Sequence, residues 1–85
     1  MAVEEEIGQV NDFFARPVVA GVALTGTLKV GDTIHIKGHT TDLTLMVESM
    51  QVSNMNVQQA KAGDQIGIKV SDRVRRGDRV YLVKP

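Results

Sequence analysis

The sequence predicts an all-β fold, a small closed or nearly closed antiparallel β-barrel of six to seven strands. A basic residue, one spacer and Gly-Asp occur three times, at Lys29–Asp32, Lys61–Asp64 and Arg75–Asp78, each followed by alternating apolar and polar residues. Gly accepts the positive φ of a tight turn, Asp can hydrogen-bond the turn backbone, and the alternation is typical of a half-buried strand. Helical periodicity is absent, and a barrel leaves no exposed strand edges.

The first two strands are expected at Ile7–Phe14 and Val18–Thr25, on either side of a break at Arg16-Pro17. Pro17 cannot donate to a strand ladder and restrains the residue before it to extended conformations. Ile7 and Val10 break strict alternation, which predicts a β-bulge in the first strand. The second strand presents alternate residues to one face, namely Val18, Ala20, Val22 and Leu24.

The next segment starts at the turn of Gly26 and contains the first repeat, in which Ile34 and Ile36 are expected to face inward. Gly38-His39-Thr40 predicts a second turn. A long strand over Thr41–Val52 follows, and its apolar phase slips by one residue around Glu48-Ser49. Such a slip indicates a β-bulge that bends the strand from one side of the barrel to the other.

The remaining elements are a polar connection at Asn54–Ala60, the second repeat, a basic turn at Asp72–Gly77 and a last strand. Their predicted inward residues are Val57, Ala60, Ile66, Ile68, Val70, Val80 and Leu82.

The length and composition predict one domain over residues 1–85, with a flexible acidic N-terminus at residues 1–6. The chain has no cysteine, which excludes disulfides and thiolate metal sites. No apolar run approaches the ~20 residues of a membrane span, and the N-terminus is acidic where a secretory signal is basic. A soluble, cytoplasmic protein without membrane contact is therefore expected.

The net charge of zero hides an asymmetry along the chain. Residues 1–60 carry three basic and seven acidic groups, a net charge of −4, and residues 61–85 carry seven basic and three acidic groups, a net charge of +4. Such a split can mark a surface for an anionic partner. Alternatively, the two sets neutralise each other when the strands fold together.

Catalysis, a metal and a nucleotide cofactor are not expected. His35 and His39 are four residues apart, but the strand pattern and Gly38 argue against the helix that would align them. His35 is expected to face outward with no acidic residue at a spacing that would orient its ring. The segment Gly21–Gly26 resembles a P-loop but lacks the lysine and hydroxyl pair that would follow it.

The binding candidates are basic residues around the third repeat, Lys69, Arg73, Arg75, Arg76 and Arg79. Arginines can contact phosphates bidentately, which predicts a contact with RNA or another anionic partner. The alternative is a solvated turn whose charges pair with Asp72 and Asp78. Phe13-Phe14 places one ring inward and one outward, and Met46, Met50 and Met55 can form either a contact face or core.

Four segments resemble the second domain of translation elongation factors of the Tu and 1-alpha type. They are Leu28–Gly38, Val47–Gln51, Ala60–Ile68 and Val74–Val80, and the resemblance runs in order over nearly the whole chain, from Ile7 to Val83. It implies a translation-protein barrel without the GTPase domain. In factors that carry aminoacyl-tRNA, this domain holds the aminoacyl end in a shallow pocket, which implies pocket positions at Gln51 and Gln65.

The function expected from these observations is a non-catalytic, elongation-factor-like module that binds tRNA, ribosomal RNA or a translation-related protein. Two alternatives remain open: an adaptor that docks on a larger protein, and the appended barrel of an enzyme whose catalytic part lies on another chain.

Overall fold

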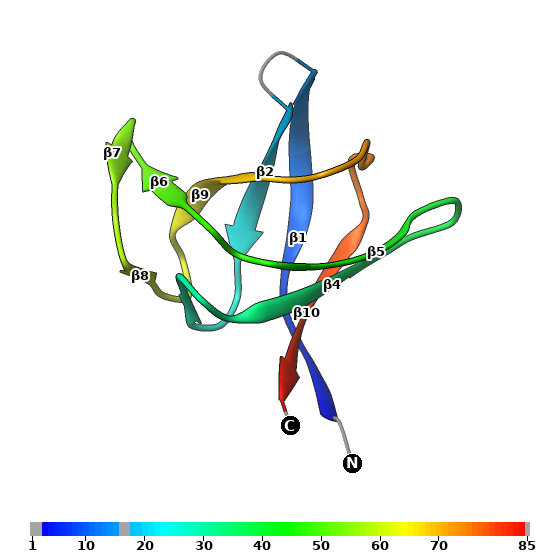
Figure 1. Cartoon of the computed structure of the whole chain (residues 1–85), viewed down its shortest axis with the longest axis horizontal. Coiled ribbons are helices and arrows are strands. Elements are labelled where there is room, and N and C mark those ends of the chain that lie inside the picture. The colour runs from blue at the N-terminus through cyan, green and yellow to red at the C-terminus, as the bar shows by residue number, and fades with distance from the viewer. Residues whose placement is uncertain (1–2, 16–17, 85) are drawn as a thin grey trace.

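The computed structural model describes residues 3–15 and 18–84, which form ten strands in two sheets (Figure 1). Seven strands have three or more residues, and three are two-residue ladders. The strands are β1 (Val3–Ala15), β2 (Val18–Leu24), β3 (Leu28–Lys29), β4 (Thr33–Lys37), β5 (Asp42–Met46), β6 (Met50–Val52), β7 (Met55–Asn56), β8 (Gln59–Ala60), β9 (Gln65–Lys69) and β10 (Arg79–Lys84). The all-β antiparallel barrel predicted from the sequence is confirmed.

The main sheet has the order β5-β4-β10-β1-β2-β9-β6-β7, and β3 pairs with β8 in a second, small sheet. Strand β5 lies at one edge of the main sheet and β6 lies near the other, although only residues 47–49 separate them in the chain. The chain therefore curls the sheet into a barrel by crossing from β4 to β9 (Figure 1).

This crossing corrects the prediction of one long strand with a bulge at Glu48-Ser49. Residues 42–46 pair with β4, and residues 50–52 pair with β9. The three residues between them pair with neither strand as a ladder. Val47 and Met50 are both buried, so the slip of the apolar phase marks a change of partner strand rather than an extra residue in one ladder.

Strand β1 contains the predicted irregularity. Its register shifts between Glu6 and Gly8 against β10, and between Val10 and Asp12 against β2. Two register shifts let a 13-residue strand bend around the barrel, so that both Ile7 and Val10 point into the core. Residues 1–6 were expected to be a flexible N-terminus, but Val3–Glu6 pair with Tyr81–Lys84 of β10 as the first residues of β1.

The three Gly-Asp repeats form the same turn. Gly31, Gly63 and Gly77 have φ of 98°, 93° and 93°. In each turn the Asp backbone N–H donates to the carbonyl of the basic residue three positions earlier, at 3.0–3.1 Å. The Asp carboxylate accepts the N–H of that same residue, at 2.8–3.0 Å. Positive φ at the third position and the closing bond are those of a type II turn.

Each turn is also hydrogen-bonded to one residue of another segment. The Gly N–H donates to, and the Asp carbonyl accepts from, the backbone of that residue, which is Val47 after β5, Leu24 at the end of β2 or Val10 within β1 for the three turns in order. These six bonds measure 2.7–3.0 Å. The repeats therefore hydrogen-bond the residues just before β4, β9 and β10 to other parts of the barrel.

The core is a single aliphatic cluster. Predicted inward residues Ala20, Val22, Leu24, Ile34, Ile36, Ala60, Ile66, Ile68, Val70 and Val80 are buried, and Val18, Val57 and Leu82 pack against the cluster from its edge. The break predicted at Arg16-Pro17 lies outside the described residues. In the part of the chain that the structure describes, no helix is long and apolar enough to span a bilayer.

Candidate binding groove and basic turn

An open groove of about 650 Å³ lies on the outer face of β1, β2, β9 and β6. One cross-strand row of outward positions forms its floor, with Asp12 opposite Gly21, Gly21 opposite Gly67, and Gly67 opposite Gln51. Two adjacent glycines leave the backbone of β2 and β9 uncovered by side chains. Glycine within a strand is often found where another group approaches the backbone closely.

Amide side chains line one side of the groove. Asn11 and Gln65 form a reciprocal pair, in which Asn11 Nδ2 donates to Gln65 Oε1 at 2.6 Å and Gln65 Nε2 donates to Asn11 Oδ1 at 2.9 Å. Gln51 Nε2 donates to Asn56 Oδ1 at 3.2 Å. These groups are exposed and can exchange their mutual bonds for bonds to a ligand.

A tight hairpin and an aromatic ring complete the lining. Ser53 and Asn54 connect β6 to β7 with φ of 52° and 64°, which are the values of a two-residue type I′ turn. Phe14 is 54% exposed and lies beside Val19, its partner in the ladder. The groove thus combines bare backbone, amides and an exposed phenyl face.

The structure brings together Gln51 and Gln65, the two pocket positions implied by the resemblance, since both line this groove. The sequence did not identify Asn11, Gly21 and Gly67 as parts of the same site. The sequence did contain a sign of this site at Gly67. This glycine stands between the inward-facing Ile66 and Ile68, at an outward strand position where a side chain is otherwise expected.

The predicted basic residues differ in their surroundings, and two of them, Arg76 and Lys69, lie against residues that line the groove, Asp12 and Val19. Arg76 Nη2 is 3.4 Å from Asp12 Oδ1, and Arg79 Nη1 is 2.9 Å from Glu6 Oε2. The guanidinium of Arg73 lies 5.8 Å from the ring centroid of Phe13, a cation–π distance. Lys69 is the last residue of the groove strand β9 and is opposite Val19.

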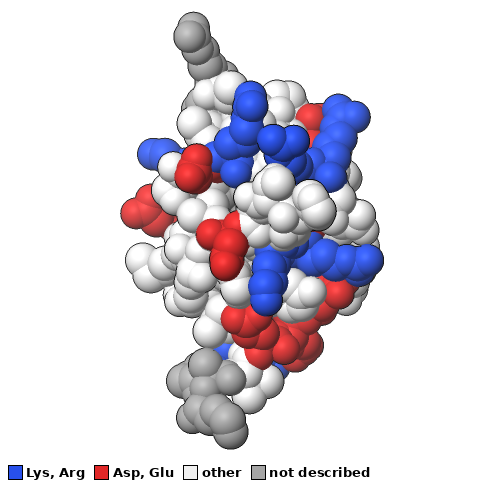
Figure 2. Space-filling model, turned by 90° about the vertical axis from the view of Figure 1, so that its right-hand side faces the viewer, with Lys and Arg blue, Asp and Glu red and all other residues white. Residues whose placement is uncertain are grey.

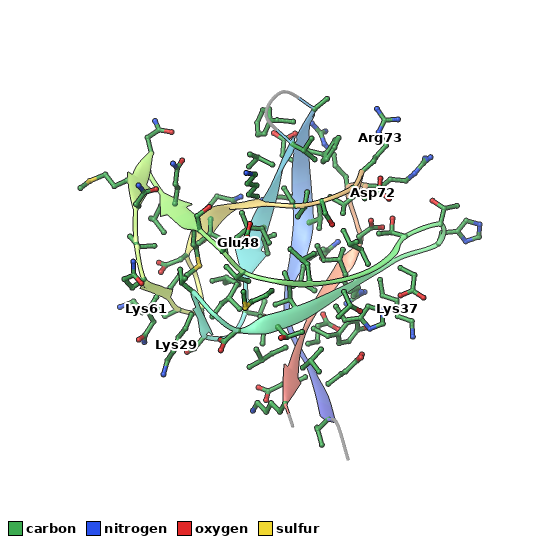
Figure 3. All side chains as sticks on the ribbon, viewed as in Figure 1. Lys29, Lys37, Glu48, Lys61, Asp72 and Arg73 are labelled. Carbon is green, nitrogen blue, oxygen red and sulfur yellow. The ribbon has the colours of Figure 1, made fainter. Side chains whose placement is uncertain are left out.

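Within residues 3–15 and 18–84, Lys69 and Arg75 form no ion pair. Figure 2 shows one face of the molecule, with basic side chains over its upper part and a second basic group, next to acidic side chains, below its middle. Figure 3 places Arg73 at one end of the molecule and Lys29 and Lys61 toward the other. The third repeat lies within a sequence that contains four arginines, Arg73, Arg75, Arg76 and Arg79, whereas each of the other two Gly-Asp turns begins with a single lysine.

Three ion pairs join the two halves of the chain, so three of the seven basic groups of residues 61–85 lie against acidic groups of residues 1–60. Lys84 Nζ is 2.8 Å from Glu5 Oε2, in addition to the Arg76 and Arg79 pairs with β1. Within the described residues, Lys61, Lys69, Arg73 and Arg75 form no such pair, so the charge asymmetry is only partly neutralised. Both phenylalanines follow the alternation, with Phe13 packed on the core and Phe14 outside.

The expectation that His35 lacks an acidic partner is wrong. His35 Nδ1 is 2.9 Å from Glu4 Oε2, and Nε2 is 2.5 Å from Asp42 Oδ1. Hydrogen bonds to Asp42 and Glu4 raise the pKa of His35, since both carboxylates favour the imidazolium. Among the described residues, no cluster of three or more His, Cys, Asp or Glu side chains is suited to hold a metal ion.

Comparison with protein families shows which barrel this is. Residues 17–81 match the family model of elongation factor Tu domain 2. The chain belongs to this family. Solved elongation factors share the fold: bacterial EF-Sec matches with a TM-score of 0.74 and 23% identity over 91% of this chain and 14% of that one. SelB of Methanococcus maripaludis matches with a TM-score of 0.63 and 22% identity, over 95% of this chain and 18% of that one.

Other proteins similar to this chain are named as proteases. The C-terminal domain of a putative U32 peptidase of Geobacillus thermoleovorans has a TM-score of 0.86 and 16% identity over 92% of this chain and 91% of that one. An uncharacterized protease of Methanocaldococcus jannaschii is 46% identical over 93% of this chain, and a collagenase of Porphyromonas gingivalis is 34% identical over 88%. This elongation factor Tu domain 2 barrel spans about a fifth of the length of these curated relatives, 20% and 21%.

Proposed function

We propose that the chain is the non-catalytic barrel of a U32 peptidase-type enzyme, as the appended-barrel alternative anticipates. The observation that carries the proposal is the 46% identity with one fifth of a protein named as a protease. The C-terminal domain of a putative U32 peptidase has the same fold as a separate unit, which supports a modular role. The catalytic groups belong, in this proposal, to the remaining part of the enzyme.

In this proposal, the groove lined by Gln51 and Gln65 presents part of the substrate to the catalytic part. Bare strand backbone at Gly21 and Gly67 admits a flat group, the amides supply donors and acceptors at its edge, and the Phe14 ring offers a stacking face. This combination suits a planar polar group such as a peptide amide or a nucleobase.

The test is affinity capture of the chain from cells of its source, with and without nuclease, followed by protein identification. A U32 peptidase-type protein in about equal amount, retained after nuclease treatment, is the expected result. Recovery of RNA and ribosomal proteins that disappear with nuclease would favour the RNA-binding function instead, and recovery of neither would contradict both.

A second candidate function is contact with tRNA or ribosomal RNA through Lys69, Arg73 and Arg75. It is favoured by the absence of ion pairs at Lys69 and Arg75 within the described part of the chain, and by the position of Lys69 beside the groove. Phosphate contacts release counterions, so binding through them weakens steeply with salt.

The RNA function is tested by titrating labelled tRNA at several salt concentrations. Arg73→Ala with Arg75→Ala is expected to weaken binding and flatten its salt dependence. Lys61→Ala is the matched control, because Lys61 occupies the position of Arg75 in the second repeat and lies toward the other end of the molecule (Figure 3). An equal loss in both variants would remove the assignment to the third turn.

A further inference from the structure

Strand β5 is an open edge of the main sheet. It pairs only with β4, with Ile34 opposite Leu45 and Ile36 opposite Leu43. Two bonds at the ends of this ladder fix its pattern: the Gly38 N–H donates to the Thr41 carbonyl, and the Val47 N–H donates to the Asp32 carbonyl, both at 2.8 Å. Hydrogen-bonded pairs alternate in an antiparallel ladder, so Leu43 and Leu45 direct their backbone groups to β4.

The backbone groups of the intervening residues, Asp42, Thr44 and Met46, therefore point away from β4. No group within residues 3–15 or 18–84 hydrogen-bonds to them. These three alternate residues therefore present unpaired N–H and C=O groups along the free side of the strand. Only another extended backbone offers donors and acceptors at the matching spacing.

The core is also incompletely covered along this edge. Leu43 and Leu45 face the core but are half-buried, whereas their ladder partners Ile36 and Ile34 are fully buried. Met46 is 56% exposed. A second groove, of about 290 Å³, runs between this edge and the end of β9, lined by Leu45, Met46, Glu48, Lys69, Val70 and Ser71. An added strand would cover the apolar side chains at the same time as it pairs with the backbone.

Strand β5 has few of the features that normally protect an edge, and its one charged residue is Asp42. It contains no Lys, Arg or Pro, and its register with β4 runs without a bulge, in contrast to β1. The charged residues that line this groove are Glu48 on the β5 side and Lys69 on the β9 side, whereas Asp42 lies at the other end of β5 with its carboxylate bonded to His35. One carboxylate and one ammonium give the groove no net positive charge to attract a polyanion, so this edge favours a polypeptide over RNA.

We propose that β5 binds an extended segment of a partner protein as an additional strand, with aliphatic side chains at alternate positions of that segment over Leu43 and Leu45. Main-chain hydrogen bonds provide the affinity and the groove selects the side chains. This surface is separate from the groove lined by Gln51 and Gln65, and the inference does not rest on the function proposed above.

The test adds a capped heptapeptide of alternating threonine and valine, flanked by lysines, to the whole chain. NMR spectroscopy then measures the hydrogen exchange of the backbone amides of the chain. Binding through the backbone is expected to tolerate many sequences, so millimolar peptide should slow exchange of the Thr44 and Met46 amides by about tenfold or more. No change at residues 42–46 at that concentration would overturn the proposal.

The informative variant is Thr44→Pro, which removes an N–H that β4 does not use and places proline at an edge position that strands tolerate. It should abolish the slowed exchange at Met46, and Thr44→Val, which keeps the N–H, should retain it. Should the proline variant not fold, the heptapeptide with N-methylated peptide bonds on the unaltered chain replaces it, and equal binding of both peptides would overturn the proposal.

Two further outcomes identify a different occupant. Concentration-dependent self-association that Thr44→Pro abolishes would mean that a second copy of the chain pairs with β5, which overturns the assignment to a partner protein. Perturbation of the same amides by tRNA but not by the peptide would overturn it as well.

Discussion

The imidazole of His35 lies between two carboxylates, Glu4 and Asp42, that are 31 and 7 residues away in the sequence. Asp42 lies on β5 two positions from Thr44, the ladder partner of His35, and Glu4 lies on β1. The side chain is 13% exposed, although the alternation correctly assigns it to the outward face. Only the order of strands in the sheet brings these residues together, and spacing along the sequence does not reveal it.

We predict that this cluster makes stability depend on pH near neutrality. The pKa of His35 is raised in the folded chain by its bonds to Asp42 and Glu4. The stabilisation is therefore fully present below the unfolded pKa of about 6.5 and is lost as the pH rises through the higher folded value. Urea unfolding midpoints should fall as pH is raised from 6 through that range.

The control for this prediction is His35→Gln, which cannot be protonated. Its midpoint should be lower than that of the unaltered chain at pH 6 and should lose the decline with rising pH. An unchanged decline in the variant would show that another group is responsible.

Gly38 and Gly67 provide a second residue-scale prediction, because a methyl group meets opposite conditions at the two positions. A Cβ at residue 38 would overlap the carboxylate of buried Asp78, whereas at residue 67 it would meet only Val19 Cγ1, at 3.5 Å. Gly38→Ala should lower the free energy of unfolding by about 1–3 kcal/mol. Gly67→Ala should leave it unchanged or raise it by up to about 1 kcal/mol.

Thermal and urea unfolding measure both variants. Equal destabilisation by the two substitutions would contradict the packing difference. Because Gly67→Ala is expected to fold, it also serves to narrow the groove in tests of ligand binding.

At the scale of elements, the three turns are identical in backbone bonds but differ in burial. Asp78 is 4% exposed, while Asp32 and Asp64 are half-buried. Each carboxylate accepts one N–H of its own turn. The free energy that each aspartate contributes should therefore follow its burial, since an unpaired buried donor is costly.

We predict that Asp78→Ala lowers the free energy of unfolding by about 1–3 kcal/mol, because it leaves the Arg75 N–H without its acceptor in a part-buried site. Asp64→Ala, at the same position of the second turn, should cost about 0.5–1.5 kcal/mol. Chemical denaturation of both variants measures the difference, and a larger loss at Asp64 would contradict this ranking.

The elements also show what the sequence could predict. Turns and inward faces were predictable because Gly, Asp and alternation act over a few residues. The change of partner strand at residues 47–49 was not predictable, because the apolar residues shift by one position in the sequence both where a ladder bulges and where it ends. The outer groove could not be predicted for a similar reason, because Gly21 and Gly67 become neighbours only when β2 pairs with β9.

For the whole molecule, the chain order places an acidic strand beside a basic one. β1 lies between β10 and β2, and Glu5 and Glu6 pair with Lys84 and Arg79. The sequence showed the charge asymmetry but left open whether it faced a partner or the chain itself. The strand order answers this for Arg76, Arg79 and Lys84, which β1 partly neutralises, but not for Lys69 and Arg75.

This arrangement predicts that exchanging the charges of Glu6 and Arg79 preserves the fold. Glu6→Lys and Arg79→Glu each place like charges together and should lower the free energy of unfolding by about 0.2–1 kcal/mol, because the pair is exposed. The double variant restores opposite charges and should recover most of that loss. Urea unfolding at low salt measures the cycle, and additive losses in the double variant would contradict a direct pair.

The same double variant separates the two roles assigned to Arg79. It moves one positive charge from β10 to the neighbouring strand without changing the net charge of the molecule. Binding to tRNA that depends on Arg79 itself should be lost although stability recovers. Unchanged binding in the titration would instead restrict any RNA contact to Lys69 and the arginines of the third turn. Among these arginines, Arg76 lies 3.4 Å from its β1 partner Asp12, a longer distance than the 2.9 Å between Arg79 and Glu6, so more of the positive charge there is left for phosphates.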